Sequence, residues 1–251
     1  MPIRTEPVLP EEEWQLTLEI EPGGIAVLTN SLPDKLNAWS WEATRQLGVL
    51  ADRIRFNDAI RVVIVQAEGR AFCAGVDLGM PEDRVTGRSP AEKVRNYYEG
   101  IRWVHERFRV FSELPQPIVC AVHGYCLGFG FELALMCDIR VASTDAIFSL
   151  PEAQVGVSID AVTAERLGII QQVTTPEELR PAARQIATEI AANAPLAVQS
   201  IKRTIDAFAY RGMAESLKFE AMSASVEFVS EDMPAGYAAK AKKQQATFEG
   251  K

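Results

Sequence analysis

The sequence predicts an α/β protein whose C-terminal part is mainly helical. Short apolar runs alternate with segments of helical periodicity over the first two thirds of the chain, and only helical patterns follow residue 176. The composition is that of an ordinary globular protein, with 251 residues, 47% hydrophobic and 24% charged. This composition argues against long intrinsic disorder, collagen and mucin-like chains.

The first part of the chain predicts a hairpin, a helix and a buried strand. Residues 14–29 contain two strand-like runs around a Pro-Gly-Gly turn at 22–24. Residues 40–57 carry apolar side chains at mainly helical spacing. Residues 61–66 form the continuous apolar run that is typical of a buried parallel strand, and a glycine-containing loop follows.

The remaining elements follow from the same patterns. A long helix is expected over 90–113, a buried strand over 115–122, a glycine-rich loop over 123–130, a short helix over 130–136, and short strands over 139–142 and 146–150. Helices are expected over 176–193, 196–211 and 212–248. We therefore expect an α/β domain over residues 1–170 and a helical region over 171–251.

Charge and cysteine usage exclude several classes of function. Lys plus Arg number 26 and Asp plus Glu number 34, a net charge of −8, which disfavours a dedicated nucleic-acid binder. The four cysteines form no CxxC pair and there are only two histidines, so neither a metal site nor a disulfide framework is expected, and free thiols fit the cytoplasm. No signal peptide is expected, because residues 1–14 contain no apolar h-region. No membrane span is expected, because no uncharged apolar run reaches about 18 residues.

Two loops carry small residues directly after predicted strands. Arg70 to Leu78 read RAFCAGVDL, and His123 to Leu133 read HGYCLGFGFEL. Small residues let the backbone approach a ligand and expose N–H groups, and the first turn of a helix offers unpaired N–H donors. Taken alone, the first loop is equally an ordinary strand-to-helix turn.

Two glutamates accompany these loops. Glu132 lies in the first turn of the short predicted helix, where a carboxylate is also simply stabilising. Glu152 follows a strand end 20 residues later, where an isolated glutamate is usually a solvated loop residue. A carboxylate pair in one apolar pocket would have different pKa values, which suits acid–base chemistry.

The order and spacing of these segments resemble the crotonase (enoyl-CoA hydratase/isomerase) superfamily, closest to enoyl-CoA hydratase. The resemblance runs from about residue 14 to the C-terminus. The matching segments are LNA at 36–38, AFCAGVDL at 71–78, HGYCLGFGFELALMCDIRVAS at 123–143, FSLPEAQVG at 148–156 and AGYAAKAKKQQATF at 235–248, the last resembling the family's closing helix. It implies the ClpP/crotonase-type fold, in which repeated ββα units form a spiral sheet core before C-terminal helices.

The resemblance also implies a reaction and its machinery. An enoyl-CoA hydratase is a lyase that adds water to a 2-trans-enoyl-CoA and gives a 3-hydroxyacyl-CoA, with no metal and no cofactor, since CoA is part of the substrate. By motif position, the N–H groups of Val76 and Phe129 bind the thioester oxygen, and Glu132 and Glu152 act as the acid–base pair. The family often has Gly where Phe129 stands, so its ring is expected to narrow the pocket.

CoA binding and assembly are implied in the same way. Lys35 is the better electrostatic candidate for the CoA phosphates than Asp34, and Lys243 is placed to reach CoA across a subunit interface. For Lys243 a solvated helix end is an equal alternative. The implied CoA- and substrate-binding residues are Lys35, Leu36, Ala74, Gly75, Asp77, Leu78, Gly128 and Lys243. The family is typically a homotrimer or a dimer of trimers.

One departure from the family pattern follows Ala161. There the chain continues directly into VTAERLGII at 162–170, so a block of roughly two to three dozen residues of the family pattern is absent, either from the gene or only from the sequence printed above. Because that block normally covers the acyl pocket, a more open pocket is expected.

Three other readings stay open at this point. The chain could catalyse another crotonase-fold reaction, such as enoyl-CoA isomerisation or a specialised hydration. It could be a non-catalytic or RNA-associated paralogue, or a CoA-binding scaffold; the net charge of −8 argues against the RNA-associated form.

Overall fold

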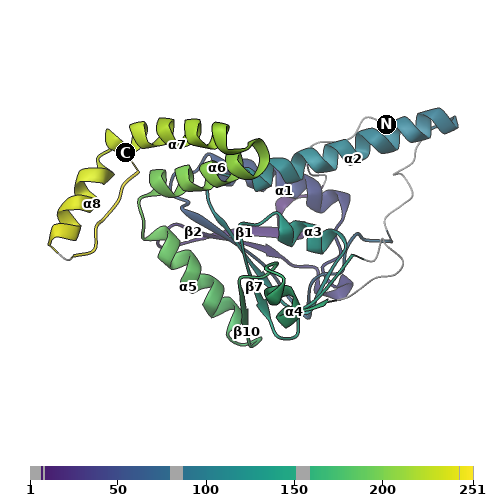
Figure 1. Cartoon of the computed structure of the whole chain (residues 1–251). Coiled ribbons are helices and arrows are strands. Elements are labelled where there is room, and N and C mark those ends of the chain that lie inside the picture. Colours follow the sequence, from purple (N-terminus) through teal and green to yellow (C-terminus); the bar gives the residue numbers. More distant parts are fainter. Residues whose placement is uncertain (1–6, 8, 80–86, 151–158, 243, 251) are drawn as a thin grey trace.

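The protein is described here from a computed structural model (Figure 1). The structure describes residues 7, 9–79, 87–150, 159–242 and 244–250. Within these ranges no helix combines the length and the apolar character that a membrane crossing requires.

A six-stranded main sheet runs through the described part of the molecule. Its strands are β1 (Leu16–Glu21), β2 (Ile25–Asn30), β3 (Val62–Ala67), β5 (Ile118–Val122), β7 (Ile139–Ser143) and β10 (Gln172–Thr174), in the spatial order β1-β2-β3-β5-β7-β10. The hairpin β1–β2 is antiparallel and every other pair is parallel. The strands predicted over 14–29, 61–66 and 115–122 are therefore confirmed, and β2 and β3 are buried almost throughout, as parallel strands covered on both faces should be.

A second, smaller sheet stands beside the first. Its described strands are β4 (Ala71–Cys73), β6 (Tyr125–Leu127), β8 (Ile147–Ser149) and β9 (Ile159–Asp160), in that order. The pairs β4–β6 and β6–β8 are parallel, and β8–β9 is antiparallel. The sequence predicted β8 but only loops where β4 and β6 lie, because each of those two three-residue strands lies between glycines.

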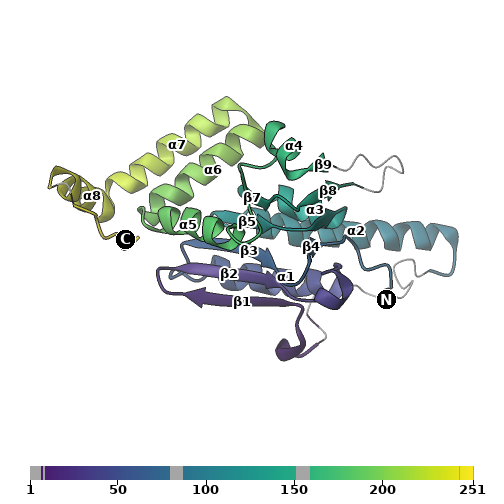
Figure 2. The ribbon, with the colours of Figure 1, turned by 90° about the horizontal axis from the view of Figure 1, so that it is seen from below.

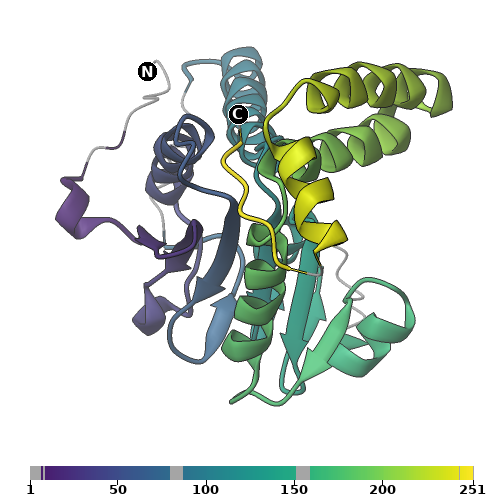
Figure 3. The same cartoon turned by 90° about the vertical axis from the view of Figure 1, so that its left-hand side faces the viewer.

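Helices cover both faces of the main sheet (Figures 1 and 3). Helix α5 (Leu179–Ala191) lies on one face, where a stripe of alanines four residues apart lets it pack closely against the valines and isoleucines of β3 and β5. Helix α1 (Trp41–Arg55) packs on the other face, and Ser40 caps it by accepting a hydrogen bond from the Ala43 N–H at 3.0 Å. Two buried layers result, and the smaller sheet adjoins the layer beneath α1.

Helix α2 (Pro90–Ser112) confirms the long helix predicted over 90–113. Its apolar side chains are buried only near its C-terminal end. Ser89 caps it and Pro90 occupies its first turn. Phe108 and Phe111 near its end are buried, whereas Val94 is 71% and Tyr98 58% exposed. Figure 2 shows why, because the first half of α2 projects beyond both sheets.

The C-terminal part contains α6 (Pro195–Arg211), α7 (Met213–Phe228) and α8 (Asp232–Ala241). The helix expected over 212–248 ends early, because residues 244–250 are not helical. The backbone of this segment forms hydrogen bonds with side chains distant in sequence. The Asp232 carboxylate accepts hydrogen bonds from the N–H groups of Glu249 and Gly250, and Arg61 donates to the Phe248 carbonyl at 2.6 Å. Since β10 and α5 belong to the main sheet and its cover, a division into domains at residue 170 stays a prediction.

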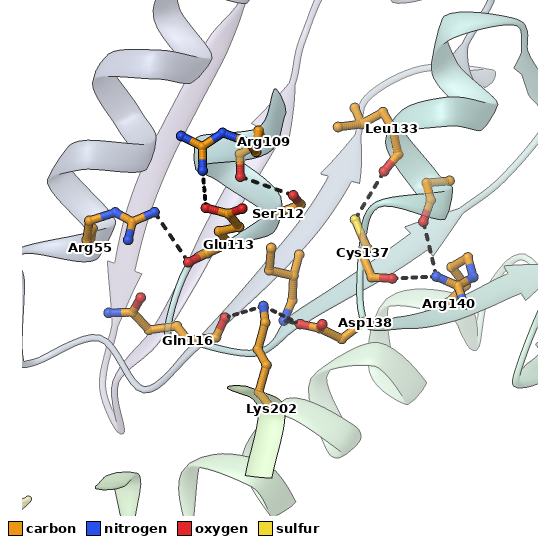
Figure 4. Close-up of polar contacts among 12 residues, drawn as sticks. Arg55, Arg109, Ser112, Glu113, Gln116, Leu133, Cys137, Asp138, Arg140 and Lys202 are labelled. Atoms are coloured by element: carbon orange, nitrogen blue, oxygen red, sulfur yellow. Dashed lines mark hydrogen bonds and ion pairs between the residues drawn. The ribbon is translucent and has the colours of Figure 1, made fainter. Parts of the chain in front are cut away.

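A buried lysine joins α6 to the sheet. The Lys202 ammonium, with its side chain 7% exposed, donates to an Asp138 carboxylate oxygen at 2.7 Å and to the Gln116 carbonyl at 3.2 Å (Figure 4). The same Asp138 oxygen accepts the Ile118 N–H at 2.7 Å, where β5 begins. One carboxylate thus ties the amino ends of β5 and β7 to the first helix of the C-terminal part.

We expect Lys202→Ala to lower the free energy of unfolding by about 2–4 kcal/mol, because it leaves a partly buried carboxylate without its cation. Urea denaturation measures this change. The matched control is Lys218→Ala, which removes a solvent-exposed pair with Glu215 and should change the free energy by less than about 0.5 kcal/mol. Equal effects of the two substitutions would contradict the anchoring role of Lys202.

Candidate active site

The two glycine-containing loops meet because β4 and β6 are parallel neighbours. Cα partners across this pair are Ala71 with Tyr125 and Cys73 with Cys126, so the segments that follow the two strands leave the sheet at the same edge. Gly75 has φ +94°, and a Cβ there would lie 3.2 Å from the Leu127 carbonyl oxygen and 4.0 Å from the Phe129 nitrogen. Only glycine combines that backbone conformation with such a close approach.

The Val76 N–H is directed away from the segment that precedes α1. Val76 and Trp39 form a parallel β-bridge, in which the Trp39 N–H donates to the Gly75 carbonyl at 2.7 Å and the Asp77 N–H donates to the Trp39 carbonyl at 2.9 Å. In this pattern the intervening N–H of Val76 faces the opposite side. No described residue accepts a hydrogen bond from it.

A second free N–H lies at the start of α3 (Phe129–Leu135). Gly128 precedes the helix with φ +48°, and its N–H is held by the Ser149 carbonyl at 2.8 Å. Because Gly128 supplies the positive φ, Phe129 itself is an ordinary first helical residue. Its N–H also finds no acceptor among the residues that the structure describes.

The Phe129 ring packs into an aromatic cluster. Its centroid lies 4.6 Å from that of Phe108, in an edge-on arrangement, and 5.5 Å from that of Trp39. Trp39 and Phe108 are both buried. The half-buried ring therefore packs at the edge of the hydrophobic core. Its contacts with Trp39 and Phe108 explain why a large residue fits at this position.

Glu132 lies on the outer side of α3. Its side chain is exposed, and its carboxylate makes no hydrogen bond or ion pair with any described residue. The capping role that a first-turn glutamate could have is therefore not seen, although its backbone N–H donates to the Gly128 carbonyl at 3.0 Å. Glu152, the expected partner, lies outside the described residues, and so does Lys243.

The expected CoA-binding residues gather beside the first loop. The Lys35 ammonium lies 2.9 Å from a carboxylate oxygen of Asp77, with the Lys35 side chain 57% exposed. Leu36 adopts φ +52° and its carbonyl accepts the Ala74 N–H at 3.0 Å. Leu78 is 92% exposed. The structure brings Lys35, Leu36, Ala74 and Asp77 together, on the side of the loop that carries Trp39.

Asn37 organises this region, and it was not singled out from the sequence. It is fully buried with φ +56°. Its side-chain amide donates to the carbonyls of Glu68 and Ala71, both at 2.6 Å, and its side-chain oxygen accepts the Leu32 N–H at 2.7 Å. The only signal was its place in the short segment LNA, since asparagine tolerates the left-handed conformation better than most residues.

Cys73, the cysteine of the first loop, is buried and does not offer a thiolate. Burial raises the pKa of the Cys73 thiol to about 11, against a smaller opposing effect of its hydrogen bond to the Gly75 carbonyl, so this thiol is neutral at pH 7. Cys73 instead packs under α3, since a Cβ on Gly130 would lie 2.6 Å from its Cβ. Among the described residues no group of three His, Cys, Asp or Glu side chains could hold a metal ion.

Comparison with known proteins gives consistent matches. The sequence profile of the enoyl-CoA hydratase/isomerase family matches residues 21–163 and 153–251. The short-chain-enoyl-CoA hydratase of Clostridium acetobutylicum is 29% identical over 84% of this chain and 88% of its own. The carnitinyl-CoA dehydratase of Proteus mirabilis is 31% identical over 73% and 78%, and the human mitochondrial Δ(3,5)-Δ(2,4)-dienoyl-CoA isomerase is 29% identical over 75% and 67%.

Solved structures share the fold. An enoyl-CoA hydratase from Bacillus anthracis superposes with a TM-score of 0.85 at 24% identity, covering 95% of this chain and all of its own. One from Polaromonas sp. JS666 gives 0.82 at 25% identity, over 93% and 99%. The expected crotonase fold, with its C-terminal helices, is thereby confirmed.

The comparisons also locate a gap. The Clostridium alignment spans 241 positions, whereas 84% of 251 residues is about 211, so about 30 aligned positions have no residue in this chain. The Proteus alignment, 212 positions against 73% of the chain, gives a similar difference. The two profile matches overlap at 153–163, which places the break where the missing block was expected.

We expect Asn37→Ala to lower the free energy of unfolding by about 2–4 kcal/mol, because a buried carbonyl, a partly buried carbonyl and one N–H lose their partner and alanine is strained at positive φ. Hydrogen exchange adds a local readout: the amides of Trp39 and Asp77 should exchange faster, while those of β2 keep their protection. The control Asn193→Ala removes an exposed amide contact at the end of α5 and should cost less than about 1 kcal/mol. Matching losses for both variants would argue against an organising role for Asn37.

Proposed function

The chain belongs to the enoyl-CoA hydratase/isomerase family, and from that premise we propose that it is an enoyl-CoA hydratase. It adds water across the 2,3 double bond of a 2-trans-enoyl-CoA and releases the 3-hydroxyacyl-CoA. The substrate's own CoA is the only coenzyme in this proposal, and no metal takes part.

One observation carries the proposal: two backbone N–H groups and a carboxylate, none of which has a hydrogen-bond partner among the described residues, lie within the first turn of α3 and the loop beside it. Attack of water at the β-carbon pushes electrons toward the thioester, whose oxygen becomes negative. The N–H groups of Val76 and Phe129 suit that charge, the second with the positive end of the helix dipole behind it. Loss of one such donor typically raises a barrier by about 2.7–4 kcal/mol.

The proposed position of the substrate puts its reacting carbons beside Glu132. Three residues of helix separate it from Phe129, a rise of about 4.5 Å. A thioester oxygen held at the helix start therefore places the α- and β-carbons near the Glu132 carboxylate. In the proposed mechanism Glu132 and Glu152 hold one water between them; the pair takes a proton from the water and delivers a proton to the α-carbon.

Double-bond isomerisation is the second candidate. It needs one carboxylate to move a proton between two carbons, and Glu132 alone could serve. The human dienoyl-CoA isomerase and the Clostridium hydratase are both 29% identical to this chain, the isomerase over 75% of it and the hydratase over 84%. The presence of Glu152 in the sequence favours hydration, since activating a water and protonating carbon divide naturally between two acids.

The CoA moiety is proposed to lie along the first loop. Lys35, held by Asp77, offers a cation to the CoA phosphates, and the exposed Leu78 with Leu36 and Ala74 offers apolar contact to the adenine. Gly75 and Gly128 let the substrate approach the backbone. Lys243 is proposed as a further CoA contact from a neighbouring subunit.

We expect the purified protein to consume crotonyl-CoA with loss of the enoyl absorbance, and Glu132→Gln and Glu152→Gln each to lower kcat at least about 100-fold. The control Glu177→Gln changes an exposed glutamate of the described structure that makes no side-chain bond, and it should keep full activity. Migration of the double bond of a 3-enoyl-CoA without hydration would favour the isomerase instead. Binding of CoA esters without any turnover would leave only a CoA-binding protein.

Self-association is a further part of the proposal. Ile201, Ile205 and Phe208 line one face of α6 at helical spacing and are each more than half exposed. A homotrimer, or a dimer of trimers, would cover such a face with copies of the chain. The four buried, unpaired cysteines support a reducing compartment, and we propose the cytoplasm.

Light scattering is therefore expected to give three or six times the chain mass of 27.7 kDa. Ile205→Asp should reduce that mass, because a buried unpaired charge opposes association. The control Gln185→Asp changes the exposed side of α5 and should leave the mass unaltered. A monomer at micromolar concentration would contradict the assembly without touching the proposed reaction.

A further inference from the structure

We propose that the acyl chain of the substrate runs along the outer face of α3, past Glu132 and onto Leu135 and Met136, so that the enzyme prefers medium and long 2-enoyl-CoA chains over crotonyl-CoA. This inference rests on the proposed function and adds a substrate class to it.

The helix itself sets up the path. Its inner residues Gly130, Phe131, Leu133 and Ala134 are buried in the core. The remaining side, one and two turns after Phe129, carries Glu132, then Leu135 and Met136 at the i+3 and i+4 positions, which are neighbours on one helix face. Leu135 is 46% and Met136 37% exposed, so an unpaired carboxylate is followed by an open apolar surface.

Helix dimensions predict how long an acyl chain must be to reach Leu135 and Met136. Leu135 and Met136 lie about 4.5–6 Å beyond Glu132 along the axis. An extended hydrocarbon chain advances about 1.3 Å per carbon, from C–C bonds near 1.5 Å. If the β-carbon is beside Glu132, about four further carbons reach the apolar pair. Crotonyl-CoA, which ends one carbon after the β-carbon, stops short of it.

A second element is tied to the end of α3. Arg140 donates from its Nε to the Ile169 carbonyl at 2.6 Å and from its Nη1 to the Ala134 carbonyl at 3.4 Å and to the Cys137 carbonyl, so it clamps the end of α3 to the segment after α4 (Ala161–Arg166). Figure 4 shows Arg140 in this position beside Leu133 and Cys137. Leu167, two residues before Ile169, is 65% exposed.

The gap relative to other family members lies at this end of the molecule. About 30 aligned positions are missing at 153–163, and Asp160 is both the last residue of β9 and the N-cap of α4. The described chain therefore passes from strand to helix with no intervening segment. A short acyl group gains little apolar contact there, whereas each added carbon on Leu135 and Met136 should raise kcat/KM roughly two- to fourfold.

The test compares kcat/KM for 2-trans-decenoyl-CoA and crotonyl-CoA. We expect a ratio of at least about 10, with the rise beginning beyond six carbons. The double variant Leu135→Ser/Met136→Ser should bring the ratio close to one. The matched control is Ile20→Ser, which changes a similarly exposed apolar residue (48%) on β1 and should keep the ratio.

Two results would overturn the inference. A ratio near one in the unaltered protein, or a ratio that the double variant leaves in place, shows that the chain lies elsewhere. A fall in molar mass on light scattering of the double variant shows that copies of the chain cover this face instead.

Failure of the proposed function is recognised separately, as absence of turnover with every chain length. Calorimetric binding then still decides the inference: decanoyl-CoA must bind at least about tenfold more tightly than butyryl-CoA, and the double variant must abolish that difference.

Discussion

The candidate site depends on the backbone of residues 74–77 being held from both sides. On one side Trp39 exchanges two hydrogen bonds with it, and on the other Gly75 lies against Leu127 and Phe129. Both contacts use main-chain atoms, so the Val76 N–H faces away from Trp39 while the preceding residue, Gly75, lies beside the start of α3. A side chain on Gly75 would separate the two donors, because at φ +94° and 3.2 Å neither the backbone nor the space allows one. The catalytic proposal thus follows from a packing constraint.

The architecture was predictable where an element is long enough to show a period. The β1–β2 hairpin, β3, β5, α1 and α2 follow from alternation, apolar runs and caps that lie within a few residues of each other. Strands β4 and β6 were read as loops, since three residues flanked by glycines carry no period and their pairing partner lies about 50 residues away. The early end of the last helix has a similar cause: Asp232 and Arg61 bind the tail through contacts distant in sequence.

The candidate site, too, was predictable only in part. Small residues after two predicted strands indicated where a ligand could meet the backbone, and the resemblance to a family assigned Val76, Phe129 and Glu132. Asn37 was missed as an organiser because its partners, Glu68 and Ala71, are more than 30 residues away, and a single asparagine in a turn is common. The Phe129 ring could not be placed either, since only the fold brings it between Trp39 and Phe108.

The gap at 153–163 falls after the elements that create the two N–H donors. Strands β4 and β6, the start of α3 and Arg140 all precede it in the chain. After it, the Ile169 carbonyl accepts a hydrogen bond from Arg140 and β10 pairs with β7 in the main sheet. The thioester end of the proposed site is therefore built from elements that precede the gap, while the acyl end is bounded by the side chains that α3 and α4 expose. The backbone that stabilises the negative charge and the segments that enclose the acyl group are separate parts of this fold. The size of the accepted acyl group can therefore change while the reaction stays the same. In this chain the apolar face of α3 would then set the chain-length preference.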